Sequence, residues 1–170
     1  MKVIVKIVAI AWIFVMISNA SGHCLGSQYG HSFRSNLQII IDRNPSYLWG
    51  GSTTEEQGLD CSGYIFLAAR RAGLPVKRTT AVVMEKGLQG WIGNRIKLEE
   101  CEELDLVWWT WKTSPARIHG HVGVLLINRR SGLLEVTHSS SKKGVIIQPM
   151  NGTLLRDLSS LKRLSIGDKR

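Results

Sequence analysis

The sequence predicts an α+β domain in which N-terminal helices pack on an antiparallel sheet. Apolar residues at helical spacing are confined to the first half of the chain, whereas short β-branched and aromatic runs separated by turns fill the second half. The length of 170 residues suits one domain, expected over residues 33–170. Apolar residues at 44% and charged residues at 21% exclude wholesale disorder.

The first 20 residues are expected to be a secretory signal peptide rather than part of the fold. Lys2 and Lys6 precede an apolar run from Ile7 to Ile17, and small residues follow up to Ala20. This run is well short of the ~20 apolar residues that a membrane-spanning helix needs, although an uncleaved anchor is the alternative. The protein is therefore expected to be exported to the periplasm or the extracellular side of the envelope.

The charge balance favours an anionic partner. The net charge is +9, and removal of residues 1–20 takes away two lysines and no acid, which leaves +7. Export argues against nucleic acid and for an acidic envelope polymer. The three cysteines are too few for a disulfide framework and are not spaced as a zinc site. An oxidising compartment permits a bridge between Cys24 and Cys101, with three reduced thiols as the alternative.

Two helices are expected in the first half of the exported chain. A polar, glycine-rich stretch over residues 21–32 is expected to be a flexible lead-in. Apolar residues then recur at helical spacing from Phe33 to Ile41, before the Asn44-Pro45 stop. A second helix opens at Asp60-Cys61-Ser62-Gly63 and ends at Gly73.

Short strands are expected to follow. A last strand is expected near Leu164–Ile166. Three tryptophans, Trp108, Trp109 and Trp111, are expected to pack in the core rather than form a sugar- or peptide-stacking platform. The four preceding strands are predicted at Leu106–Trp111, His121–Ile127, Leu133–His138 and Val145–Ile147.

Cys61, at the start of the second helix, is the candidate nucleophile. Backbone N–H groups and the helix dipole favour a thiolate there, so the pKa of the thiol is expected to be lowered. His121 begins the next strong strand and can act as the general base, and His138 ends the following strand, where antiparallel pairing can bring it to the ring of His121. The Ser62-Gly63 pair is expected to let a substrate backbone approach. Each residue alone is more often structural, but the set together favours catalysis.

In this order, the motifs resemble those of the NlpC family of papain-like cysteine peptidases, which are bacterial cell-wall endopeptidases. The resemblance spans residues 47 to about 147 and implies a papain-like fold with the nucleophile helix packed on a central antiparallel sheet. Cysteine chemistry needs no cofactor or metal, so none is expected. The matching elements are Tyr47-x-Trp49-Gly50-Gly51, Asp60-Cys61-Ser62-Gly63, Arg78-Thr79-Thr80, Leu106-Val107-Trp108, His121-Val122-Gly123-Val124 and His138-Ser139-Ser140-Ser141 with Gly144-Val145.

The resemblance implies a role for each matching residue at the catalytic centre. Cys61 would be the nucleophile, His121 the general base and then acid, and His138 the group that orients the imidazole of His121. Tyr47 would lie beside the nucleophile, where its hydroxyl can stabilise the oxyanion or contact substrate.

The resemblance also implies a subsite for a free substrate amine. Asp60 and Ser62 would bind the amine, and Arg78 would support that subsite. A charge-assisted hydrogen bond of this kind is worth about 1.5–3 kcal/mol. Asp60 can also be the N-cap of the helix that carries the nucleophile, and both roles can hold together.

Two departures from the family pattern concern loops. The family usually carries Pro-Gly-Asp where this chain has Glu103-Leu104-Asp105. That change puts loop geometry in question rather than catalysis. The basic stretch from Thr110 to His119 looks inserted and is expected to form one wall of the cleft.

The expected function is hydrolysis of peptidoglycan stem peptides by a cysteine endopeptidase through an acyl-enzyme. The resemblance points to the bond between γ-D-glutamate and the diamino acid. The alternatives are an N-acetylmuramoyl-L-alanine amidase, a transpeptidase-like acyl transferase on the same fold, or a non-catalytic wall-binding protein. The expected partner is the stem peptide, with no nucleic acid, only transient membrane contact through the signal segment, and a monomeric state.

Overall fold

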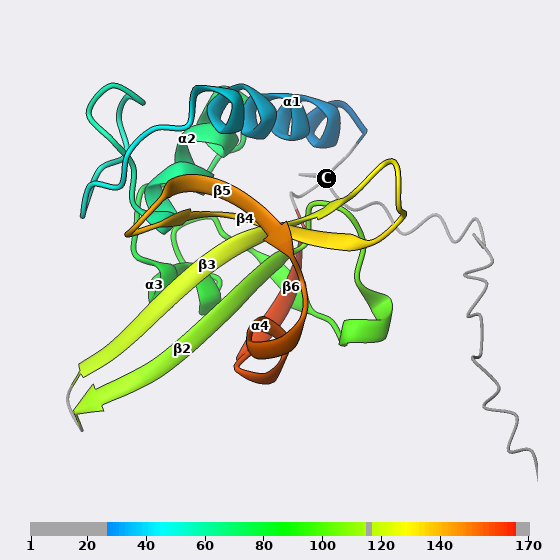
Figure 1. Ribbon diagram of the computed structural model, residues 1–170. Coiled ribbons are helices and arrows are strands. Elements are labelled where there is room, and N and C mark those ends of the chain that lie inside the picture. Colours follow the sequence, from blue (N-terminus) through cyan, green and yellow to red (C-terminus); the bar gives the residue numbers. More distant parts are fainter. Residues whose placement is uncertain (1–26, 115–116, 166–170) are drawn as a thin grey trace, which may run out of the picture.

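The computed structural model describes residues 27–114 and 117–165. The expected signal segment and Cys24 lie outside these residues. Helices cover one face of a six-stranded antiparallel sheet (Figure 1). Across the sheet the strands follow the order β1 (Gly93–Arg95), β6 (Ser160–Leu164), β2 (Leu106–Ser114), β3 (Arg117–Ile127), β4 (Leu134–Ser140) and β5 (Gly144–Pro149). The α+β class and the antiparallel sheet predicted from the sequence are therefore confirmed. Within the described residues, no helix is both long and apolar enough to cross a membrane.

Helix α1 (Ser27–Arg43) starts six residues earlier than the predicted helix. The stretch 27–32, expected to be part of a flexible lead-in, forms its first turns. The helix is anchored by three buried apolar residues, Phe33, Leu37 and Ile40. Polar residues before Phe33 extend the same helix along the surface, where they need no apolar partner. The helix ends as predicted, because Asn44 adopts a φ of 43° and proline follows.

Helix α2 (Cys61–Arg71) lies between α1 and the sheet and is buried from Cys61 to Ala69. Asp60 caps its N-terminus, since the Asp60 carboxylate accepts a hydrogen bond from the Gly63 N–H. Gly73, with a φ of 81°, follows its C-terminus. The predicted start and end of this helix are both confirmed.

The sheet contains all four strands predicted between Leu106 and Ile147. The predicted last strand begins earlier than expected, at Ser160. Several elements of three to five residues were not predicted, because they are too short to show a period. The strands are β1 (Gly93–Arg95), β2 (Leu106–Ser114), β3 (Arg117–Ile127), β4 (Leu134–Ser140), β5 (Gly144–Pro149) and β6 (Ser160–Leu164). The short helices are α3 (Ala81–Glu85), η1 (Leu98–Glu100) and α4 (Gly152–Arg156).

The basic stretch from Thr110 to His119 contributes the last residues of β2 and the first residues of β3, and residues 115–116 between them lie outside the described part. Trp111 pairs with His119, and Ser114 pairs with Arg117, with a register shift between them. The stretch is thus continuous with the two central strands. The side chains of residues 111–119 lie outside the described part, so its expected role as a cleft wall stays a prediction.

Consecutive tryptophans on β2 serve opposite faces of the sheet. Trp108 is buried on the face that packs against α1 and α2. Trp109 is buried on the other face, beneath α4 and the segment around Ile96. Alternation of side chains along the strand accounts for the two separate cores. The expectation that the tryptophans pack in the core is confirmed for Trp108 and Trp109, while the side chain of Trp111 lies outside the described part.

The Glu103-Leu104-Asp105 turn keeps the geometry that a glycine favours. Leu104 adopts a φ of 75° at the position where the family usually has glycine. Asp105 is buried, and both of its carboxylate oxygens accept hydrogen bonds from Arg163 on β6, at 3.0 Å each. The turn is therefore held by an ion pair whose carboxylate is buried.

A break in the sheet creates the space for a site. The β3–β4 ladder runs from the Ile127–Leu134 pair to the Val124–Thr137 pair, whereas β3 continues to pair with β2 for several more residues. Beyond the ladder, β3 and the β4–β5 pair separate (Figure 1). The N-terminal end of α2 faces this separation, so a helix terminus and two strand segments meet there.

Candidate active site

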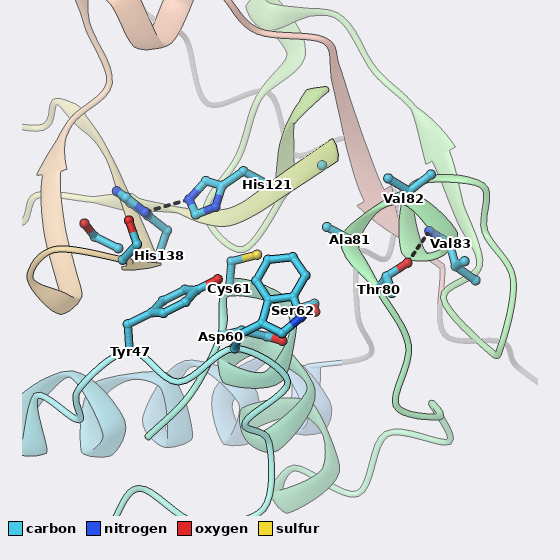
Figure 2. A pocket seen from close by; sticks show the side chains of 14 residues that line it. Tyr47, Asp60, Cys61, Ser62, Thr80, Ala81, Val82, Val83, His121 and His138 are labelled. Carbon is cyan, nitrogen blue, oxygen red and sulfur yellow. Dashed lines mark hydrogen bonds between the residues drawn. The ribbon is translucent and has the colours of Figure 1, made fainter. Parts of the chain in front are cut away.

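A pocket of ≈ 780 Å³ opens where α2, β3 and β4 meet. Cys61 reaches it from the first turn of α2, His121 from β3 and His138 from β4, while Tyr47 comes from the loop after α1 (Figure 2). The structure thus brings together four residues that are 91 positions apart at their extremes. The fold, rather than a local motif, assembles this group.

The two histidines form a hydrogen-bonded pair, which we call the histidine relay. His121 Nε2 lies 2.8 Å from His138 Nδ1, and the rings meet edge to face with centroids 4.8 Å apart. Because Nε2 of His121 is used in this contact, only Nδ1 remains available to serve Cys61. A third member was not anticipated from the sequence: the Gln148 side-chain amide nitrogen lies 2.9 Å from His138 Nε2.

Burial keeps the relay uncharged. Trp109 packs against both rings, with centroids 5.7 Å from His121 and 6.4 Å from His138. Desolvation, together with the neighbouring His138, lowers the pKa of His121 to about 3. Desolvation lowers the pKa of His138 to about 4. Both rings are therefore neutral near pH 7, so each keeps one ring nitrogen unprotonated.

The thiol of Cys61 differs from the expectation drawn from its place at a helix start. Burial raises its pKa to about 11, and the Asp60 carboxylate adds to this rise. Hydrogen bonds from the Val122 and Ser62 backbone N–H groups, and the Arg78 charge, act in the opposite direction but do not compensate. The expected lowering of the pKa was wrong, because desolvation by tertiary packing outweighs the helix terminus.

With both groups neutral at rest, attack by the sulfur would require transfer of the thiol proton to His121 Nδ1, as in general-base catalysis. The Val122 and Ser62 N–H groups that face the sulfur then stabilise the charge as it forms.

Tyr47 offers a hydrogen-bond donor at the same place. Its hydroxyl points toward the Cys61 sulfur (Figure 2). Burial, followed by the charges of Cys61 and Asp60, raises the pKa of Tyr47 to about 12. The phenol is therefore protonated at neutral pH and can donate a hydrogen bond to a negative oxygen that forms near the sulfur.

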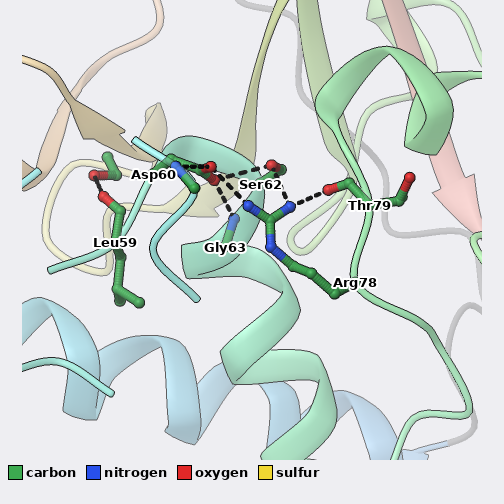
Figure 3. A network of polar contacts seen from close by, with 8 residues as sticks. Leu59, Asp60, Ser62, Gly63, Arg78 and Thr79 are labelled. Carbon is green, nitrogen blue, oxygen red and sulfur yellow. Dashed lines mark hydrogen bonds and ion pairs between the residues drawn. The ribbon is translucent and has the colours of Figure 1, made fainter. Parts of the chain in front are cut away.

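Asp60 is the centre of a polar network with Ser62 and Arg78 (Figure 3). One Asp60 oxygen accepts from Ser62 Oγ at 2.9 Å and from the Gly63 N–H at 2.6 Å. The other accepts from the Gly50 N–H at 2.9 Å and from Arg78 Nη2 at 2.6 Å. Arg78 Nη1 also donates to Ser62 Oγ at 2.9 Å and to the Thr79 carbonyl oxygen.

The side chains expected to bind a substrate amine are instead hydrogen-bonded to each other and to nearby backbone groups. A carboxylate has about four lone-pair positions, and the four donors fill those of Asp60. The expected N-cap role of Asp60 is confirmed by its bond to Gly63. A substrate ammonium group that bound Asp60 would have to displace one of the present donors.

The glycines of two motifs are required by contact within the protein. A Cβ on Gly63 would lie 1.9 Å from the backbone oxygen of Gly51, and a Cβ on Gly51 would lie 2.3 Å from the backbone oxygen of Gly58. The loop that carries Tyr47 therefore rests directly on the first turn of α2. The backbone that approaches Gly63 belongs to the protein itself, not to a substrate as expected.

The rim of the pocket holds residues without an expected role. Trp49, at 78% exposure, lines it on the side of the Tyr47 loop. Ala81 and Val82 of α3 line another side (Figure 2), and Trp108 anchors that helix by donating from Nε1 to the Ala81 carbonyl oxygen at 3.0 Å. Thr80, the N-cap of α3, was the only sequence signal for this wall. Within the described residues, no group of three or more His, Cys, Asp or Glu side chains could hold a metal ion.

Comparisons with known proteins identify the family and the fold. A model of the NlpC/P60 family matches residues 44–160. A crystal structure from Staphylococcus aureus subsp. aureus Mu50, described as similar to lipoprotein, NLP/P60 family, is similar to this chain, with a TM-score of 0.60 and 18% sequence identity. The match covers 86% of this chain but 45% of that structure, so this chain spans less than half of its length. At this identity the likeness shows the fold alone. None of the curated proteins matches the sequence.

Proposed function

Because the chain belongs to the NlpC/P60 family, whose members are generally cysteine peptidases, we propose that it hydrolyses peptidoglycan stem peptides between γ-D-glutamate and the diamino acid. Family membership suggests a cell-wall peptidase or related function, and the catalysis and the bond are our proposal. The observation that carries it is the contact of 2.8 Å between His121 and His138 beside the pocket that Cys61 lines.

The first half of the reaction forms an acyl-enzyme. The Cys61 sulfur attacks the γ-carbonyl carbon of glutamate while His121 Nδ1 takes the thiol proton. The resulting imidazolium donates from Nε2 to His138 Nδ1, which stabilises its charge. The Tyr47 hydroxyl, which points toward the Cys61 sulfur, is our proposed donor to the developing oxyanion.

The second half releases both products. The protonated His121 gives its proton to the amine of the diamino acid, which leaves. Water, deprotonated by the same nitrogen, then attacks the thioester and frees the glutamate carboxylate and the Cys61 thiol. Because the relay is neutral at rest, His121 can act as acid and base in turn without an added cofactor.

Recognition of a free stem amine is the proposed role of Asp60 and Ser62. Such an amine would enter by replacing the Arg78 guanidinium or the Gly50 N–H at Asp60, since the carboxylate has no vacant position. The exchange of one charged donor for another makes the net gain small. We therefore expect this subsite to choose among substrates more than to tighten binding.

The proposed surroundings are extracytoplasmic, in contact with the wall. The net charge of +9 suits an anionic envelope surface, and added salt should weaken the attraction. The expected signal segment is the sequence feature that supports export, and fractionation of cells that express the full chain tests it.

Product analysis distinguishes the proposed bond from the alternatives. The purified protein is incubated with an L-Ala-γ-D-Glu-diaminopimelate tripeptide and, separately, with intact sacculi, and products are identified by mass spectrometry. The proposal predicts release of L-Ala-γ-D-Glu from the tripeptide. Whole stems freed from sacculi, with the tripeptide uncut, would instead identify an amidase. No product from either substrate would favour the wall-binding alternative.

A further inference from the structure

Gln148 on β5 lies behind the histidine relay. In the β4–β5 ladder, His138 pairs with Ile146 and Val136 pairs with Gln148. Residues two apart on a strand share a face, so Gln148 and His138 are diagonal neighbours on one face of the sheet. Their side chains meet at 2.9 Å, between the Gln148 amide nitrogen and His138 Nε2. The chain of contacts therefore continues past His138 to a neutral amide.

The protons in this chain of contacts are coupled. A neutral imidazole has one N–H donor and one acceptor nitrogen. To take the proton of Cys61, His121 must keep Nδ1 unprotonated, so its own proton is on Nε2 and is donated to His138 Nδ1. His138 must then carry its proton on Nε2, the nitrogen that faces Gln148.

An N–H on His138 Nε2 needs an acceptor at that position. His138 is 8% exposed, and the partner that the structure places at Nε2 is the Gln148 side-chain amide. The side-chain amide of Gln148 has an N–H donor and an oxygen acceptor, which exchange places when the amide rotates by 180°. Gln148 can therefore either donate a hydrogen bond to His138 Nε2 or accept one from it. If the amide nitrogen faces His138, it donates to Nε2, and the proton of His138 is then on Nδ1 and is donated to His121 Nε2. The proton of His121 is in that case on Nδ1, where it blocks proton transfer from Cys61.

We propose that Gln148 is a positioning residue whose amide oxygen accepts the His138 Nε2–H in the reactive state and so sets the proton polarity of the relay. The consequence for catalysis rests on the proposed peptidase function. The proton positions themselves do not depend on turnover, so they can be tested separately.

Nuclear magnetic resonance tests the proton positions directly. Long-range ¹H–¹⁵N correlation spectra of histidine-labelled protein at pH 7 should show both His121 and His138 protonated on Nε2. In Gln148→Leu the tautomer preference of His138 should be lost. A wild-type His138 protonated on Nδ1, or a Gln148→Leu spectrum identical to that of wild type, would overturn the inference even if the protein had no peptidase activity.

Kinetics on the tripeptide tests the consequence for catalysis. Loss of the partner behind a functional histidine costs about 10- to 100-fold in metal sites, and we expect kcat of Gln148→Leu to fall in that range with KM unchanged. Gln148→Glu, which presents oxygen at both ends, should keep kcat within about threefold of wild type, since the acceptor is retained. Gln38→Leu makes the same change at a half-buried glutamine of α1 and should leave kcat unchanged.

The kinetic results distinguish a role of the Gln148 acceptor oxygen from a role of the side-chain shape alone. Equal loss in Gln148→Leu and Gln148→Glu would show that side-chain shape matters rather than the acceptor, and would overturn the inference. Wild-type kcat in Gln148→Leu would do the same. If the wild-type protein cleaves no substrate, the proposed function is wrong, and the magnetic resonance spectra alone test the role of Gln148.

Discussion

Alkylation of Cys61 should be slow at neutral pH and should accelerate steeply as the pH rises. Burial raises the pKa of its thiol to about 11. At pH 7 only ~1 thiol in 10,000 is then ionised, and that fraction grows about tenfold for each pH unit up to the pKa. Since the thiolate is the reacting form, the rate with iodoacetamide should rise about 1,000-fold from pH 7 to pH 10.

The chain provides an internal reference for this measurement. Burial also raises the pKa of Cys101 to about 11, and this thiol packs against the second core and does not line the pocket. Rates at both sites can be read from the same digest by mass spectrometry of the two peptides. The two rates should rise in parallel.

A thiolate–imidazolium pair at rest would give a different result. Cys61 would then react quickly and at a constant rate from about pH 5 to pH 8, while Cys101 kept its steep rise. That outcome would refute the neutral thiol and imidazole pair, and with it the general-base scheme.

Three further predictions follow from the same contacts. Both relay histidines are neutral in the folded protein, whereas unfolded histidine titrates near pH 6.5, so the unfolded state binds more protons between about pH 4 and 6.5. The free energy of unfolding should therefore fall as the pH drops through that window, by up to about 1.4 kcal/mol per pH unit for each histidine. Equal urea midpoints at pH 7 and pH 5 would contradict this. Gly63→Ala should lower the free energy of unfolding by about 3 kcal/mol or more, because the new Cβ would overlap a backbone oxygen. The control Gly132→Ala has open space around the Cβ but a φ of 69°, and should lower it by about 1 kcal/mol. Chemical denaturation measures both. Asp60→Ala should cost about 2–3 kcal/mol through loss of the helix cap and the Arg78 pair, and a thermal melt unchanged from wild type would show that the network contributes nothing.

The features that could be predicted from the sequence are those with local signals. Asp60 before a helical run, and Gly73 after it, predicted α2 correctly, because capping and termination depend on neighbouring residues. The central strands were predicted for the same reason, since alternation is visible within five or six residues. Short elements such as α3 lack such a period and depend on tertiary contacts.

The parts of the site that were missed depend on packing and register. Gln148 meets His138 only because β4 and β5 pair in one register, which no local pattern fixes. The raised pKa of the Cys61 thiol comes from the sheet and loop that bury it, and a helix-terminus argument alone gives the wrong sign. The contact between Gly63 and Gly51 likewise joins two motifs that sequence reasoning treated separately.

The most direct test of the central claim is the rate of tripeptide cleavage by wild-type protein and by Cys61→Ala, with acid-quenched samples digested to locate any acyl group. The account predicts L-Ala-γ-D-Glu release by wild type alone, with the L-Ala-γ-D-Glu acyl group on the peptide that contains Cys61. Release of the same dipeptide by Cys61→Ala at the wild-type rate would contradict it.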